Sequence, residues 1–175
     1  MTLTLCYAPR ACSLVPFVTL TEAGTDFDVV PLDFSKGQQN SPEYLRLNPK
    51  HKVPVLLIDG EPLTENVAIQ IWVARNFPAA KLLPADPGQE LKAISLMAWC
   101  ASGIHTWLTP NFKPSNSCDL QGSEESVTSC SKKMLAEQFA ITDATLNTGV
   151  FVPKDLSSVW LFVTEKKSPD RTQYE

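Results

Sequence analysis

A cysteine lies where a strand gives way to a helix in the stretch YAPRACS, Tyr7 to Ser13. β-branched and apolar residues predict a strand over 2–7, and the apolar spacing that ends at Gly24 predicts a helix over 13–23. Cys12 would then lie at a helix N-terminus, where unpaired N–H groups and the helix dipole stabilise a thiolate. Such a position lowers a cysteine pKa from about 8.5 to between about 3.5 and 7.5, which favours thiol chemistry. The alternative is a small buried side chain that only fills space.

Further strands and helices must position this cysteine. Residues 26–34, DFDVVPLDF, alternate as a strand does, and 41–49, SPEYLRLNP, predict a short helix between a serine cap and a closing proline. Residues 53–63 contain an apolar run, an Asp-Gly turn and a return strand, which predict a hairpin. A helix follows over 64–78, with Thr64 as its N-cap. The predicted order is βαβ followed by ββα.

The second half of the chain has a different pattern. The stretch FPAAKLLPADPG, which ends at Gly88, contains three prolines and one glycine, and it is typical of a linker. Helical spacing of apolar residues returns over 89–108 and 123–146, on either side of a polar, proline-containing loop over 109–122. The apolar block in LSSVWLFVTEKK is too short to distinguish a helix from a strand, and KKSPDRTQYE resembles a solvated tail.

Composition narrows the class of protein. The chain has 175 residues, of which 43% are hydrophobic, with a net charge of −4 and a pI near 5.2. Because it has no apolar run of roughly 20 residues and no signal-peptide pattern, we expect a cytoplasmic protein. Scattered basic residues on an acidic chain argue against a nucleic-acid partner. Five cysteines without a CxxC pair, together with only two histidines, predict neither a disulfide framework nor a metal site.

Several separated motifs follow the order of a known family. YAPRACS with LVPFVTLTEAG, then NPKHKVPVLLIDG, LTENVAIQIWVA and MAWCASGIH resemble the cytosolic glutathione transferases. They look most like the bacterial beta class, which carries a cysteine at the Cys12 position. The resemblance spans roughly residues 1–146. It implies an α/β thioredoxin-like domain over 1–78, a linker over 79–88 and an all-α helical domain over 89–175.

The sequence departs from the family pattern at several positions. Arg10 and His51 stand where the family usually has glycine, and Asn66 stands where a serine usually follows the glutamate. Near the C-terminus, Ser157 is followed three residues later by a tryptophan instead of the aspartate that caps a helix in the family. The helical domain is therefore expected to be shortened and divergent after about residue 143.

Two motifs carry the glutathione site that the resemblance implies. A cis peptide between Val53 and Pro54 would turn the Val53 N–H and C=O toward the cysteinyl part of glutathione, whereas an ordinary trans proline is the alternative. Glu65 and Asn66 begin a helix whose N–H groups attract a carboxylate, and Glu65 can take up an ammonium. The γ-glutamyl end of glutathione carries both groups. On position alone, Glu65 would only favour the helix start.

Other polar residues complete the predicted site. Lys36 and Lys52 are candidates to pair with the glycyl carboxylate, although a loop lysine is often only solvated. His105 lies on a helix that faces the glutathione site in this family. It would donate to glutathione or position a water, or else be a satisfied core histidine. Tyr7 and Ser13 offer hydroxyl groups near the sulfur as further candidates for catalysis.

The resemblance implies a glutathione transferase that conjugates the glutathione thiolate to small electrophilic compounds. Glutathione is then the co-substrate, no metal is needed, the protein is a homodimer, and neither nucleic acid nor membrane is a partner. Two alternatives stay open. In one, Cys12 exchanges disulfides with glutathione as a single thiol. In the other, the protein binds glutathione without catalysis.

Overall fold

The computed structural model describes residues 1–147, so the predictions for the divergent C-terminal end lie outside the described residues. The described chain divides into two compact units, with the boundary between Leu83 and Pro84. This division falls inside the stretch that was expected to be a linker. Each unit is described separately below.

The first unit is built on a four-stranded mixed sheet in the order β2-β1-β3-β4. The central strand β1 (Leu3–Tyr7) pairs in parallel with β2 (Asp28–Pro31) and antiparallel with β3 (Val55–Ile58). The edge strand β4 (Glu61–Thr64) pairs antiparallel with β3 through the Asp-Gly turn. This sheet confirms the predicted βαβ and ββα order of a thioredoxin-like domain.

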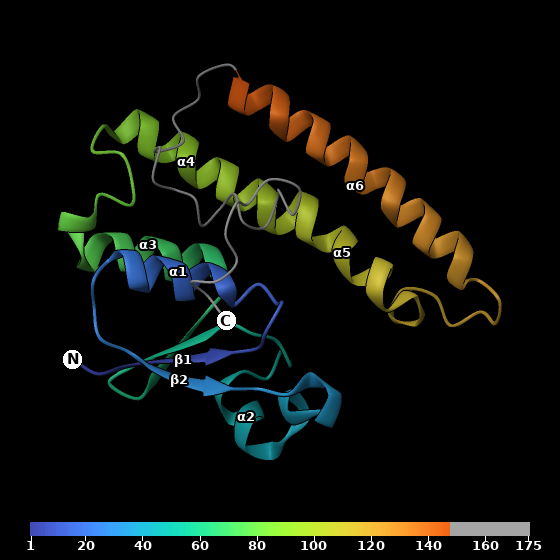
Figure 1. The fold of residues 1–175 in the computed structure, drawn as a ribbon, viewed down its shortest axis with the longest axis horizontal. Coiled ribbons are helices and arrows are strands. Elements are labelled where there is room, and N and C mark those ends of the chain that lie inside the picture. The colour runs from blue at the N-terminus through green and yellow to red at the C-terminus, as the bar shows by residue number, and fades with distance from the viewer. Residues whose placement is uncertain (148–175) are drawn as a thin grey trace. The chain divides into compact units, whose positions relative to one another are not determined.

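Three helices cover the two faces of this sheet. Helices α1 (Leu14–Glu22) and α3 (Asn66–Asn76) lie on one face, and α2 (Pro42–Leu47) lies on the other (Figure 1). Because side chains alternate along a strand, β1 contributes to both cores. Leu3 and Leu5 pack into the cluster under α1 and α3, whereas Cys6 packs into the cluster that contains residues of α2.

Local sequence explains where these helices begin. The Ser41 hydroxyl accepts the Tyr44 N–H at 3.2 Å and a proline fills the first position of α2, as predicted. The prediction that Thr64 caps α3 was wrong by one residue. Thr64 is the last residue of β4, and Glu65 is the N-cap, with φ of 72°. Glu65 is therefore the single residue between strand β4 and helix α3.

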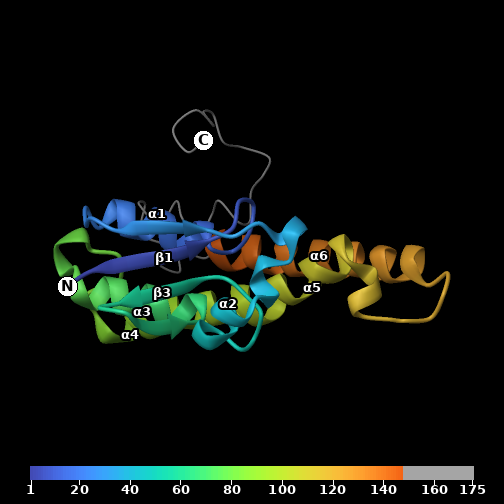
Figure 2. The same ribbon diagram turned by 90° about the horizontal axis from the view of Figure 1, so that it is seen from below.

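The second unit consists of helices. Helix α4 (Pro87–Trp99) continues through a π-helical turn (Cys100–Ile104) into α5 (His105–Phe112), and α6 (Glu124–Asn147) follows. Helices α5 and α6 pack side by side (Figures 1 and 2). The Trp99 indole N–H donates to the Thr142 hydroxyl at 3.3 Å, which ties the end of α4 to α6.

The predicted loop over 109–122 was partly wrong, because α5 continues to Phe112 with Pro110 inside it. A proline inside a helix usually costs about 3 kcal/mol, which is why the sequence favoured an earlier end. Here α5 packs along α6, and the Ser131 hydroxyl donates to the Trp107 carbonyl. This tertiary packing outweighs the local preference, and the helix still ends two residues after the proline.

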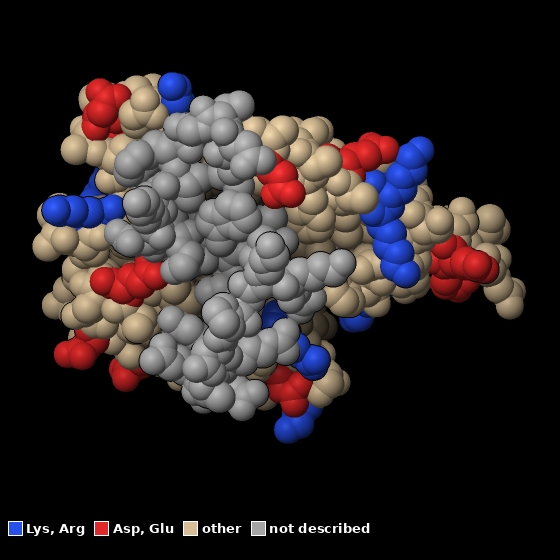
Figure 3. All heavy atoms as spheres, turned by 45° about the horizontal axis from the view of Figure 1, so that its top comes forward, with Lys and Arg blue, Asp and Glu red and all other residues tan. Residues whose placement is uncertain are grey.

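Charged side chains of both signs are scattered over one face of the described residues (Figure 3). On the face drawn in Figure 3, acidic and basic side chains lie among one another, as their scattering in the sequence predicts. Over residues 1–147, no helix combines the length and the apolar character that crossing a membrane requires. Within the same range, the His, Cys, Asp and Glu side chains form no group of three or more that would hold a metal ion.

Candidate functional site

The loop between β1 and α1 is folded tightly around Ser13. The Ala11 N–H donates to the Ala8 carbonyl at 3.2 Å, and Arg10 has φ of 58°. The Ser13 hydroxyl accepts the Ala8 N–H at 3.0 Å and donates to the Ala8 carbonyl at 3.1 Å. Ser13 is fully buried. In this structure the Ser13 hydroxyl therefore holds the loop together, and its predicted catalytic role stays a prediction.

Cys12 joins this loop to two other segments of the first unit. Its thiol donates to the Val53 carbonyl at 3.1 Å, and its own carbonyl accepts the Asn66 side-chain amide at 3.0 Å. The Val53–Pro54 peptide is cis, as predicted. Residues from the β1–α1 loop, the turn before β3 and the start of α3 thus converge on one cysteine.

The Cys12 thiol does not have the low pKa that its place near a helix N-terminus predicted. The pKa of Cys12 is raised above its ordinary value, chiefly by burial and slightly by the Glu65 charge, although a backbone hydrogen bond, the Lys52 charge and the Asn66 amide each lower it. The prediction counted the helix N-terminus but not the desolvation of the sulfur. In this structure Cys12 is a protonated hydrogen-bond donor.

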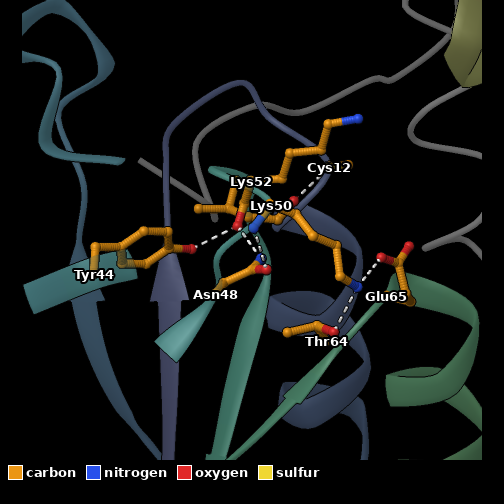
Figure 4. Close-up of polar contacts among 8 residues, drawn as sticks. Cys12, Tyr44, Asn48, Lys50, Lys52, Thr64 and Glu65 are labelled. Carbon is orange, nitrogen blue, oxygen red and sulfur yellow. Dashed lines mark hydrogen bonds and ion pairs between the residues drawn. The ribbon is translucent and has the colours of Figure 1, made fainter. Parts of the chain in front are cut away.

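The turn that carries Lys52 is fixed from the other face of the sheet (Figure 4). The Tyr44 hydroxyl and the Asn48 side-chain amide both donate to the Lys52 carbonyl, each at 2.7 Å. Burial raises the pKa of Tyr44, which keeps its hydroxyl a donor. These two bonds hold the backbone that leads into Val53.

Glu65 occupies a backbone conformation that side chains rarely adopt. Its φ of 72° lies in the left-handed region, which costs a non-glycine residue of order 1–3 kcal/mol. The Lys50 ammonium binds the Glu65 carboxylate at 2.5 Å and the Thr64 hydroxyl at 2.9 Å (Figure 4). Beside it, no group of the described residues hydrogen-bonds to the buried Asn66 side-chain oxygen. Strain of this kind clusters at functional sites.

The remaining predicted site residues have other contacts. The Lys36 ammonium pairs with Asp33 at 3.7 Å, with 73% of its side chain exposed. The Tyr7 ring packs on Phe17, with ring centroids 5.5 Å apart, and Tyr7 is a partly buried residue packed against the core cluster under α1 and α3. His105 begins α5 in the second unit, so its predicted role toward glutathione stays a prediction.

Sequence reasoning missed three residues of this site. Lys50 is one of several loop lysines, and Tyr44 and Asn48 lie in and after a short helix, so their residue types alone do not mark them. The available signal was spacing: Tyr44 and Asn48 lie eight and four residues before Lys52 in sequence, on the same short segment. Lys50 is separated from Glu65 by fifteen residues, and only the hairpin between them brings the two together.

The first unit matches a described domain family. Residues 1–75 match the family "Glutathione S-transferase, N-terminal domain". Glutathione S-transferase GstA from Escherichia coli O157:H7 is 41% identical over 113 residues, which cover 63% of this chain and 56% of that protein. The chain thus matches little more than half the length of this curated relative.

Solved structures extend the similarity beyond the first unit. A glutathione transferase homolog from Sulfitobacter, with bound glutathione, has a TM-score of 0.84 and 30% identity, covering 93% of this chain and 80% of that one. A bacterial beta class glutathione S-transferase from Sphingomonas chungbukensis has a TM-score of 0.75 and 31% identity, covering 91% and 79%. With the cis Val53–Pro54 turn and the strained Glu65 in place, the chain belongs to the glutathione S-transferase family.

Proposed function

We propose that this protein is a glutathione transferase that joins the glutathione sulfur to small electrophilic compounds. The observation that carries the proposal is the convergence on Cys12 of the cis Val53–Pro54 turn and the Asn66 end of α3. A structural relative with bound glutathione supports it. Glutathione would pair its backbone with Val53, and its γ-glutamyl end would meet Glu65 and the buried Asn66 oxygen.

The reaction requires the glutathione thiol to lose its proton to solvent. The thiolate then forms a bond to an electrophilic carbon, and the leaving group departs or the double bond accepts the electron pair. Because burial keeps Cys12 protonated, its role in this proposal is to donate its S–H to the glutathione thiolate. Hydrogen bonding to the charged form lowers the pKa of the bound thiol. Cys12 would leave the Val53 carbonyl to do so.

The alternative of disulfide exchange through Cys12 needs this residue as a thiolate. Its raised pKa makes that route slower at neutral pH than a helix N-terminus alone would suggest. The alternative of binding without catalysis needs no Cys12 thiolate. Measurements on one protein preparation separate the three readings: conjugation of glutathione to 1-chloro-2,4-dinitrobenzene, and glutathione-dependent reduction of 2-hydroxyethyl disulfide.

We expect conjugation to survive Cys12→Ser, which keeps a donor, and to fall roughly tenfold to a hundredfold in Cys12→Ala, as for a hydrogen bond to a charged group. Cys130→Ala, at an exposed cysteine of α6, is the matched control and should keep full activity. Full conjugating activity in Cys12→Ala would remove Cys12 from the mechanism. Activity only in the disulfide assay, lost in both Cys12 variants, would favour the exchange reaction instead.

We also propose a homodimer, on the basis of family membership. Sedimentation at tens of micromolar protein should give twice the mass of the chain. A monomeric mass together with full conjugating activity would show that one chain is sufficient.

A further inference from the structure

The carboxylate predicted to bind the ammonium of glutathione already binds an ammonium. It belongs to Lys50, whose Nζ lies 2.5 Å from Glu65 Oε1 and 2.9 Å from the Thr64 hydroxyl (Figure 4). The side chains of Lys50 and Glu65 are 48% and 68% exposed. This is an open site on which one ammonium can replace another without burying a charge.

The backbone of Lys50 is held in place by hydrogen bonds of Asn48, and about half of its side chain is exposed. The Asn48 side-chain oxygen accepts the Lys50 N–H at 3.2 Å, and the Asn48 amide binds the Lys52 carbonyl at 2.7 Å. The Lys50 side chain reaches from this turn to the end of β4, whereas the Lys52 side chain extends away from Glu65 (Figure 4). Lys50 is thus tethered next to Glu65 at a high effective concentration.

We propose that Lys50 is a tethered competitor for the Glu65 carboxylate, which an incoming γ-glutamyl ammonium must displace. The inference rests on the proposed function, because it takes the ligand to be glutathione. Binding then exchanges one ion pair for another, so Glu65 contributes less to affinity than a free carboxylate would. A ligand that lacks the ammonium leaves Lys50 in place and leaves no charge unpaired. Lys50 therefore lowers both the affinity for glutathione and the discrimination against such ligands.

Calorimetric titration with two S-methylated ligands tests this inference without thiol chemistry. One is S-methylglutathione, and the other is its analogue in which glutaryl replaces the γ-glutamyl group and the ammonium is missing. In Lys50→Met we expect S-methylglutathione to bind roughly twofold to fivefold more tightly than in the wild type, the range for one exposed ion pair. The analogue should bind no more tightly. Lys132→Met, which removes the same charge from an exposed position on α6, is the control and should change neither value.

Amine labelling of the wild-type protein gives a second measurement that does not depend on a variant. Saturating S-methylglutathione should increase the acetylation rate of Lys50, read by peptide mass spectrometry against Lys132, and the analogue should not. Equal or weaker binding of S-methylglutathione to Lys50→Met, or an unchanged Lys50 labelling rate, would overturn the inference alone. An absence of binding heat with every variant would overturn the proposed function along with it.

Discussion

The two ends of the proposed glutathione site are built in opposite ways. At the sulfur end, Cys12 and Ser13 bind neighbouring carbonyl groups through a thiol and a hydroxyl, and Ser13 is fully buried. At the other end, Lys50 and Glu65 form an ion pair with most of the Glu65 side chain exposed. Neutral donors thus hold the buried loop around Cys12, where an unpaired charge would be costly, and the charged groups lie where water can screen them.

This difference predicts opposite responses to substitution. A buried group with two hydrogen bonds cannot be lost without leaving its partners unsatisfied, whereas an exposed ion pair contributes little to folding. Substitutions at the sulfur end should therefore change the free energy of unfolding. Substitutions at the ammonium end should change ligand affinity and leave stability nearly constant.

The largest effect is expected for Ser13→Ala. Without the hydroxyl, the buried Ala8 N–H loses its partner and the Ala8 carbonyl keeps only the Ala11 N–H, so urea unfolding should show a loss of about 1–3 kcal/mol. The control is Thr21→Ala, at an exposed hydroxyl on α1 that donates to the Phe17 carbonyl, with a change within about 0.5 kcal/mol. Equal losses in both variants would mean that the buried position of Ser13 does not determine how much its hydroxyl contributes to the free energy of unfolding.

Alkaline pH should weaken the sulfur end next. The pKa of Cys12 is raised in the folded protein, so its contribution to stability is complete below the unfolded pKa, near 8.5, and is lost as the pH rises through the higher folded value. Within that window the free energy of unfolding should fall by up to about 1.4 kcal/mol per pH unit for this group. Cys12→Ser, which retains a donor to Val53, should show a shallower fall. Parallel curves for the two proteins would contradict the raised pKa.

Glycine at two left-handed positions should stabilise the first unit. Arg10 and His51 have φ of 58° and 59°, a conformation that costs a side chain about 1 kcal/mol, so Arg10→Gly should raise the free energy of unfolding by about that amount. His51→Gly should gain less, because the His51 ring also bonds Asn40 at 2.8 Å. The control is Arg46→Gly in helix α2, which should lose about 1 kcal/mol.

The smallest change in stability is expected at the ammonium end. Glu65→Gln breaks only an exposed ion pair, so the free energy of unfolding should stay within about 0.5 kcal/mol of the wild type. The same variant should lose affinity for S-methylglutathione, because a neutral amide binds an ammonium more weakly than a carboxylate does. A loss of stability comparable to that of Ser13→Ala would erase the contrast between the two ends.

The sequence predicted most of the first unit because its local signals agree with one another. Strand alternation, the Ser41 cap and the Asp-Gly turn each pointed to the element that the structure contains. The exceptions come from longer-range effects. Helix α5 passes Pro110 because it packs on α6, and Cys12 has a raised pKa because distant segments bury its sulfur.

The sequence pointed to the candidate site residues that stand in family motifs. It missed those whose contacts form only when distant segments fold together. Val53, Glu65 and Asn66 stand in the KVP and TEN motifs, so their sequence context pointed to them. Lys50 reaches Glu65 only after β3 and β4 fold back on each other. Arg10 and His51 stand where the family usually has glycine, and both adopt the left-handed backbone conformation that glycine favours. Their residue types alone would not have suggested this.

The two hydrogen bonds to the Lys52 carbonyl also limit how an extended ligand can align with the turn. A carbonyl oxygen has two lone pairs, and Tyr44 and Asn48 occupy both of those on Lys52. At Val53 the carbonyl accepts only the Cys12 thiol among the described residues, so one acceptor position is left. A peptide that slips by one residue toward Lys52 would find no acceptor there. For the proposed glutathione ligand, pairing at Val53 and not at Lys52 would set a single register, with the ligand sulfur opposite Cys12.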